Sequence, residues 1–208
     1  MSQTIAVGRA AERITERGLT GLFATLAYRA GNGPMRRLRT RFHLRSEGYF
    51  AFELVPERDM PTLAAEPHVT LRADFERVGA ASVAVERIVD GPDLTLDEVE
   101  RNVGGRTIKV QRIAGAPFDL SLTVDPAAVA LAGMVLRDHD PAAPIEGVRV
   151  TAGPASAVTD SAGRFLLPAL PLLAEVELEI EVGHTLTPHV YRIDYETPVN
   201  RVTLSLPS

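Results

Sequence analysis

Short runs in which apolar and polar residues alternate, separated by glycine and proline, constrain the fold of this chain more than any other feature. In RLRTRFHLR (37–45) and EVELEIEV (175–182), every second residue is charged or histidine, and the residues between them are apolar except Thr40. Because successive side chains of a strand point to opposite faces, each run predicts a strand with one buried face. The 16 glycines and 15 prolines divide much of the remaining chain into similar runs. This pattern predicts an all-β fold of the sandwich type.

One segment departs from this pattern and favours a helix. In TLDEVERNV (95–103), Thr95 can act as the N-cap, a glutamate follows three residues later, and the apolar residues fall on one helical face. We therefore predict one short helix near residues 95–103. Residues 9–17 fit a short helix and a charged edge strand equally well.

The chain carries the same landmarks twice. SEGYF (46–50) aligns with SAGRF (161–165), and a glycine that opens an apolar run lies upstream of each, Gly21 and Gly133. Each unit also ends with a proline followed by an alternating strand. Three landmarks in the same order predict an ancient duplication of one fold.

The second copy of the motif reads as a turn that leads into a strand. In TDSAGRF (159–165), Asp160 can accept hydrogen bonds from backbone N–H groups of the turn. Gly163 is expected to supply a positive φ, and Phe165 to point into the core as an anchor. We interpret the motif as structural rather than catalytic.

Residues 130–208 resemble the carboxypeptidase regulatory-like domain, a transthyretin-like β-sandwich. The resemblance rests on the TDSAGRF motif together with Gly133, PIEGV (144–148) and the Leu170–Pro171 pair. Such domains serve as accessory, spacer or binding modules, so the resemblance implies a shape more than an activity.

Duplication and resemblance together give the predicted organisation. We expect two tandem transthyretin-like or immunoglobulin-like β-sandwiches, residues 1–126 and residues 127–208. The first resembles the family more loosely and has an insert between residues 56 and 105. A single merged sandwich is the alternative.

Charge and composition exclude several classes of protein. The formal net charge is −5, and residues 127–208 hold 5 basic and 10 acidic residues, which argues against general nucleic-acid binding. The absence of cysteine excludes disulfides and cysteine-based zinc sites. The N-terminus lacks the pattern of a signal peptide, and no apolar run reaches the ~20 residues that span a bilayer. We therefore expect a cytoplasmic protein without a membrane span.

Candidate catalytic residues are few. His184, His189, Tyr191 and Tyr195 are the residue types that bind ferric iron in intradiol ring-cleaving dioxygenases, which use a related sandwich. Their order and spacing here do not match that set, so we interpret them as strand tyrosines and loop histidines. We expect no enzyme activity, no cofactor and no metal site.

The two charged runs are the candidate interaction surfaces. Each row of like charges is either a solvated face paired with neighbouring strands, or a surface that meets the opposite row across domains or between subunits. An outside partner with an acidic surface would also suit the arginine row. The candidate residues are Arg37, Arg39, Arg41, Arg45, Glu175, Glu177, Glu179 and Glu181.

These observations predict a non-enzymatic structural or protein-interaction component. Within that class we favour a subunit of a bacterial particle assembled in the cytoplasm, such as a contractile injection system. One alternative is an accessory module that binds carbohydrate or another ligand, although tryptophan is absent and aromatic residues make up only 5%. The other alternative is an iron-dependent ring-cleaving oxygenase.

Overall fold

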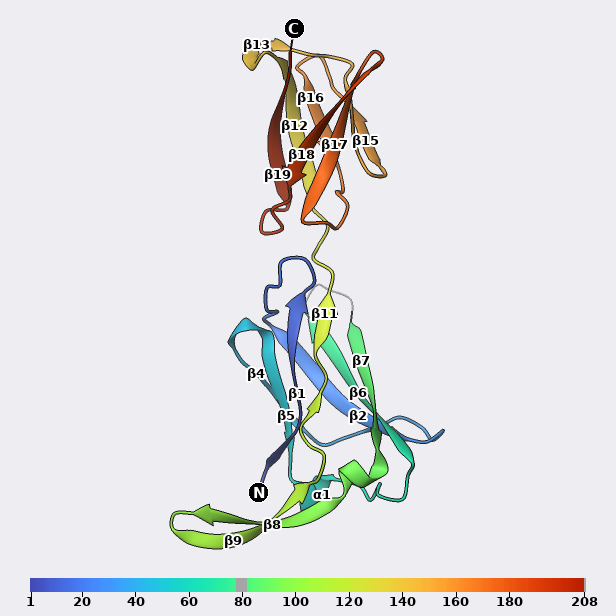
Figure 1. Ribbon diagram of the computed structural model, residues 1–208, viewed down its shortest axis with the longest axis vertical. Helices are drawn as coiled ribbons and strands as arrows, with labels where there is room; N and C mark the ends of the chain where they lie inside the picture. The colour runs from blue at the N-terminus through green and yellow to red at the C-terminus, as the bar shows by residue number, and fades with distance from the viewer. Residues whose placement is uncertain (78–81, 208) are drawn as a thin grey trace. The chain divides into compact units, whose positions relative to one another are not determined.

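The structure is a computed structural model that describes residues 1–77 and 82–207, and it is built almost entirely of strands (Figure 1). The all-β prediction is confirmed. The chain divides into two compact units. Unit 1 comprises Met1–Glu12 and Glu16–Val124, and unit 2 comprises Arg13–Thr15 and Asp125–Ser208.

Unit 1 is a sandwich of two sheets with one separate hairpin. In the first sheet, β10 (Phe118–Asp119), β1 (Gln3–Glu12), β5 (Tyr49–Leu54) and β4 (Arg41–Leu44) lie in that order, and β11 (Leu122–Val124) also pairs with β1. In the second, the order is β3 (Arg36–Arg37), β2 (Leu22–Ala30), β6 (His68–Arg77) and β7 (Val83–Asp90). Strands β8 (Leu96–Val103) and β9 (Arg106–Ile113) form the hairpin.

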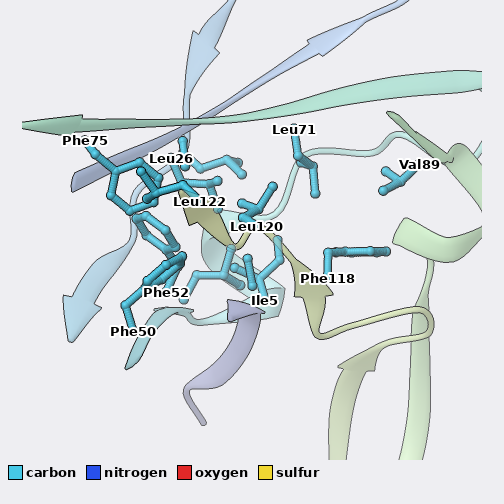
Figure 2. Close-up of a cluster of buried hydrophobic side chains, with 14 of the residues drawn as sticks. Ile5, Leu26, Phe50, Phe52, Leu71, Phe75, Val89, Phe118, Leu120 and Leu122 are labelled. Carbon is cyan, nitrogen blue, oxygen red and sulfur yellow. The ribbon is translucent and has the colours of Figure 1, made fainter. Parts of the chain in front are cut away.

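Alternate side chains of the two sheets fill the core of unit 1. Figure 2 shows Phe50 and Phe52 of β5 beside Phe75 of β6, among aliphatic residues from both sheets. The ring centroids of Phe50 and Phe75 are 5.0 Å apart, and Phe42 lies 5.1 Å from Phe52. Tilted and edge-on rings at these separations attract one another beyond the burial of their area. This aromatic cluster is the centre of the unit 1 core.

Unit 2 is a second sandwich of two sheets. In one sheet, β13 (Asp140–Pro144), β12 (Ala130–Arg137) and β16 (Arg164–Leu167) lie in that order, and β19 (Val199–Leu206) pairs with β12. In the other, the order is β15 (Ala155–Val158), β14 (Arg149–Ala152), β17 (Glu175–Val182) and β18 (Thr185–Arg192). Phe165 is 5% exposed and belongs to the core, which confirms its predicted role as an anchor.

Helical structure among the described residues is limited to three short segments. They are the 3₁₀ turns η1 (Ser46–Gly48) and η2 (Gly91–Leu94) and the four-residue helix α1 (Pro56–Asp59). The helix predicted near residues 95–103 is wrong, because residues 96–103 are strand β8. Thr95 ends η2, with its hydroxyl donating to the Pro92 carbonyl at 2.7 Å, instead of starting a helix. Pairing along the whole length of β9 outweighs the weak local preference for a helix.

The strand predicted for residues 37–45 is divided between the two sheets of unit 1. Arg37 pairs with β2, whereas residues 41–44 pair with β5. Leu38 lies between the two pieces, is 3% exposed, and donates its N–H to the Leu26 carbonyl at 2.8 Å. The alternation predicted which side chains are buried, but it contained no information about which neighbour each half would pair with.

A glycine faces a phenylalanine at the same place in both units. Gly8 pairs with Phe50 across β1 and β5, and Gly133 pairs with Phe165 across β12 and β16. At either glycine a Cβ would overlap the phenylalanine ring, so only glycine fits there. The structural counterpart of Gly133 is therefore Gly8, and its predicted match with Gly21 is wrong. The phenylalanines align as the sequence predicted.

The turns that precede the two phenylalanines also correspond. Gly48 and Gly163 have φ angles of +76° and +67°, as predicted for Gly163. The backbone N–H of Arg45 donates to Tyr49 O at 2.7 Å, and that of Asp160 donates to Arg164 O at 2.9 Å. The Asp160 carboxylate accepts from the N–H of Ala162 and of Arg164 at 2.9 and 2.8 Å, which confirms the predicted role of this side chain.

Candidate interaction surfaces

The glutamate row predicted in unit 2 exists and lies on the outside of its sheet. Alternation along β17 sends Val176, Leu178 and Ile180 into the core, and each is at most 4% exposed. The four glutamates between them face outward. One ion pair reaches the row, from Arg149 Nε to Glu181 Oε2 at 3.4 Å; the other three glutamates have none within the described residues.

Exposed apolar side chains flank this glutamate row. On the neighbouring edge strand β18, Leu186 lies opposite Glu181 and Val190 lies opposite Glu177, so all four share the outer face. Leu186 and Val190 are 63% and 64% exposed. We refer to this surface as the acidic face. Its residues are Glu175, Glu177, Glu179, Glu181, Leu186 and Val190, and the register also places the exposed Arg192 on it, opposite Glu175 but without an ion pair in the described residues.

The predicted arginines of unit 1 do not form one row. Arg37 lies on β3 at the edge of one sheet, whereas Arg41 lies on β4 at the edge of the other. Arg39 falls between the two strands, and Arg45 follows β4. All four are exposed, and none of their guanidinium groups makes an ion pair in the described parts of the chain. They are therefore four exposed charges without an ion pair, although Arg39 attracts the Asp59 carboxylate from a longer distance.

Arg39 and Arg41 lie near one end of unit 1. The hydrogen bond from Arg58 lowers the pKa of the Asp59 carboxyl in α1 to about 2, the backbone N–H of Val55 adds to this, and Arg39 contributes a smaller attraction. Arg41 is the cross-strand neighbour of Glu53, which lines a hollow of about 370 Å³. The same hollow is lined by Met1–Thr4 and by residues of β8 and β9.

The hairpin β8–β9 is a functional candidate that we did not predict from the sequence. Its two strands pair along their whole length, and within the described residues neither pairs with a third strand. Figure 1 shows the hairpin leaving the sandwich. Its root is fixed, because Ile113 is fully buried and its N–H donates to Gln3 Oε1 at 2.9 Å. We refer to residues 96–113 as the hairpin arm.

One face of the hairpin arm is both basic and apolar. The register places Val99 opposite Val110, Arg101 opposite Ile108, and Val103 opposite Arg106, and all six residues share this face. Val103 is 49% exposed and Ile108 is 36% exposed. The opposite face carries an ion pair from Lys109 Nζ to Glu98 Oε1 at 2.6 Å.

A sequence signal for the arm was available at its tip. Gly104 and Gly105 form the turn with φ angles of +60° and +79°, and Gly-Gly favours the two-residue hairpin turn with two positive φ angles. The β-branched residues of RTIKVQRI (106–113) supply the second strand. Glycine also ends helices, so the same pair agrees with the helix predicted near residues 95–103 and does not by itself identify the hairpin.

The two tyrosines considered for iron have structural roles. The prediction of strand tyrosines and loop histidines is wrong for Tyr195, which lies in a turn, and for His189, which lies on β18. Tyr191 donates its hydroxyl to Asn200 Oδ1 at 3.1 Å, and Tyr195 donates to the Leu173 carbonyl at 2.9 Å. Burial is the main reason why the pKa of each tyrosine is raised. Among residues 1–77 and 82–207, no three His, Asp or Glu side chains gather as metal ligands would.

The outer face of β1 and β5 contains a shallow hollow of about 480 Å³ that bears on the ligand-binding alternative. Arg9, Arg45, Tyr49, Asp119 and Ser121 are among its lining residues. Tyr49 is 52% exposed, but the Arg9 guanidinium carbon lies 5.6 Å from the centre of its ring. One face of this aromatic ring is therefore covered by a cation and is not free to stack on a sugar.

Comparisons with known proteins place the chain in no family. No family model and no curated protein matches it. Among solved structures it is similar to the Bacillus anthracis TIE protein, with 12% identity and a TM-score of 0.33 over 99% of this chain and 40% of that one. It is also similar to BcpA, the major pilin subunit of Bacillus cereus, with 7% identity and a TM-score of 0.31 over 98% and 59%. The chain thus spans 40% to 59% of the length of these proteins. In the described residues no helix is long and apolar enough to cross a membrane.

Proposed function

We propose that this chain is a non-enzymatic structural component that works through contacts with other protein chains. The observation that carries the proposal is the acidic face, where Glu175, Glu177 and Glu179 repeat along one strand without an ionic partner in the described residues. Like charges two residues apart on one face repel each other, and a partner of opposite charge removes that cost. Burial of the exposed Leu186 and Val190 beside them would add a favourable hydrophobic contribution to the contact.

The two units are, in this proposal, two domains that descend from one transthyretin-like sandwich of the carboxypeptidase regulatory-like type. Support comes from the shared pairing of glycine with phenylalanine and from the shared positive φ in the preceding turn. In both units the first strand also pairs in parallel with a strand near the end of the unit, β1 with β11 and β12 with β19.

A fragment of residues 127–208 is expected to fold on its own. It contains the whole hydrophobic core of unit 2, from Val129 to Leu206. Differential scanning calorimetry of the fragment should give one cooperative transition at the temperature of the corresponding transition in the whole chain. A fragment that is unfolded at 25 °C would show that residues 1–126 are needed for its stability, and would contradict two separate domains.

The setting that we propose is a bacterial particle assembled in the cytoplasm, such as a contractile injection system. The support is the resemblance of unit 2 to accessory and spacer modules, together with the charged surfaces that make few ion pairs within the described residues. Assembly through charged surfaces implies that association weakens as salt rises, because the Debye length falls from about 30 Å at 0.01 M to about 3 Å at 1 M.

Reversing two arginines should weaken association in low salt. The double variant Arg39→Glu, Arg41→Glu replaces two exposed cations near the end of unit 1 with anions, which would repel the acidic face. Sedimentation velocity should show that the parent chain associates at about 0.01 M salt and not at about 1 M salt. At about 0.01 M salt the variant should associate less than the parent chain. The matched control is Arg164→Glu, Arg201→Glu, two reversals on the other sheet of unit 2. If the variant associates like its parent in low salt, these arginines are not an interaction surface.

A further inference from the structure

We propose that the hairpin arm of one copy docks on the acidic face of unit 2 of a second copy, so that chains join head to tail. This inference rests on the proposed function and names the partner of that surface. The recognition combines apolar contact between valine, isoleucine and leucine side chains with attraction between arginines and glutamates.

The arm would be stabilised if another protein surface packed against its apolar face. A two-stranded hairpin is marginally stable in water by itself and needs a third strand or a packed face. Of its apolar residues only Ile113, at the root, is fully buried, while Val103 and Ile108 stay exposed. Covering the face of Val99, Val103, Ile108 and Val110 would therefore stabilise both the arm and the contact.

The acidic face matches the arm in charge as well as in polarity. Arg101, Arg106 and Arg112 lie on the apolar face of the arm, and none of them makes an ion pair within the described residues. Asp97, opposite Arg112, is the one carboxylate that the register of the two strands places on this face. The acidic face presents unpaired glutamates next to Leu186 and Val190. In a contact between the two surfaces, arginines of the arm would pair with glutamates of the acidic face, and the apolar side chains of both would pack together.

The contact is expected to be face to face rather than edge to edge. Strand β18 is the edge of its sheet, and Pro188 in its middle has no N–H to donate to an added strand. Proline on an edge strand therefore opposes pairing with another chain. Stacking the arm on the outer surface of β17 and β18 avoids this obstacle, with the layers about 10 Å apart.

The arm and the exit of the chain from unit 1 lie at opposite ends of β1. The arm root is bonded to Gln3 at one end of β1, whereas β11, from which the chain leaves unit 1, pairs with Glu12 at the other end. Nine residues of strand separate these ends by about 30 Å. Because the two surfaces are different, their contact is heterologous, and each copy offers an arm to one neighbour and an acidic face to another.

A charge exchange between two variants tests the proposal. The first variant carries Arg101→Glu and Arg106→Glu on the arm, and the second carries Glu177→Arg and Glu179→Arg on the acidic face. Each variant alone should associate about tenfold or more weakly than the parent in low salt, because arm and face then have the same sign. An equal mixture should recover association, since each arm meets a face of opposite charge. Light scattering and sedimentation velocity measure both results.

The control leaves the basic and apolar face of the arm unchanged and alters only the opposite face. The pair Glu98→Lys, Lys109→Glu exchanges the ion pair on the opposite arm face and should leave association unchanged. Circular dichroism and the thermal transitions confirm that every variant remains folded. Association that each charge variant retains, or that the mixture fails to recover, would overturn the arm assignment.

Disulfide trapping gives a second readout, because the chain contains no cysteine of its own. Chains with Ile108→Cys mixed with chains with Val190→Cys should form a linked dimer under a mild oxidant in low salt. Replacing the second variant with Leu166→Cys, exposed on the other sheet of unit 2, should not. Equal linkage in both mixtures would contradict the proposed site.

The results also separate this inference from the proposed function. If the charge variants on the arm behave like the parent while Arg39→Glu, Arg41→Glu weakens association, the arm assignment is wrong and the proposed function stands. If the parent chain stays monomeric at every salt and protein concentration tested, the arm assignment is overturned, and the proposed function requires a different protein as the partner.

Discussion

Replacing Gly48 with alanine is expected to destabilise unit 1 strongly while unit 2 keeps its own thermal transition. A Cβ at this buried position would overlap the carbonyl oxygen of Ala10 and lie 2.8 Å from the backbone nitrogen of Leu19. Backbone atoms cannot move aside as a side chain can, and the φ of +76° adds strain for any residue with a Cβ. Overpacking and the left-handed conformation together cost about 3 kcal/mol or more, which lowers the transition of unit 1 by ~10 °C or more in calorimetry.

Two further glycines serve as comparisons for this substitution. Gly163→Ala should destabilise unit 2 in the same way, because its Cβ would lie 2.6 Å from the carbonyl oxygen of Val135. Gly104→Ala at the arm tip also has a positive φ, but no atom lies within 4 Å of its Cβ, so about 1 kcal/mol is expected. If all three variants melt alike, crowding is not what requires glycine at residue 48.

The features that the sequence predicted correctly depend only on interactions between residues close together in the chain. Period-two alternation predicted the buried and exposed sides of β17 correctly, because it depends only on the backbone geometry of a single strand. The turn before Phe165 was also predictable, since each motif residue satisfies a need within a few residues of itself. Thr159 is a similar case: its hydroxyl donates to Ile145 O and accepts from the N–H of Val148, which closes the preceding loop.

The failures concern pairing between distant residues. Local signals near residue 95 resemble a helix start, and only the partner strand that begins at Arg106 makes the segment a hairpin. Residues 37–45 show the predicted alternation of buried and exposed side chains, yet the two ends of the run pair with strands of two different sheets. Gly21 opens an apolar run, whereas Gly8 is followed by Arg9. Only the cross-strand contact of Gly8 with Phe50 identifies it as the counterpart of Gly133.

The candidate surfaces also differ in whether they depend on one strand or on the pairing of two. The glutamate row was found because one strand carries it entirely. The basic and apolar face of the arm was not found, because it is formed by alternate residues of two strands whose register the sequence does not state. Surfaces made by one element are therefore visible in a sequence, and surfaces made by pairing become visible only with the fold.

Truncating Phe52 to alanine should destabilise unit 1 more than any other single truncation of a side chain in its aromatic cluster. Phe52 is fully buried, and its ring lies within 6.4 Å of those of Phe42, Phe50 and Phe75. The substitution removes the ring, the contacts among the aromatic residues and the filling of the space between the sheets. Loss of a buried phenylalanine costs about 3–5 kcal/mol, measurable as a lower midpoint of the unit 1 transition in urea.

The matched control for Phe52 is the same substitution at Phe23, whose side chain is 67% exposed on the outer face of β2. Phe23→Ala removes the same atoms from a site with little packing, so its effect should stay within about 0.5 kcal/mol. A large difference between the two variants, confined to the unit 1 transition, attributes the stability of this sandwich to its inner aromatic layer. Similar effects at both positions would mean that the cluster between the sheets is not what holds unit 1 together.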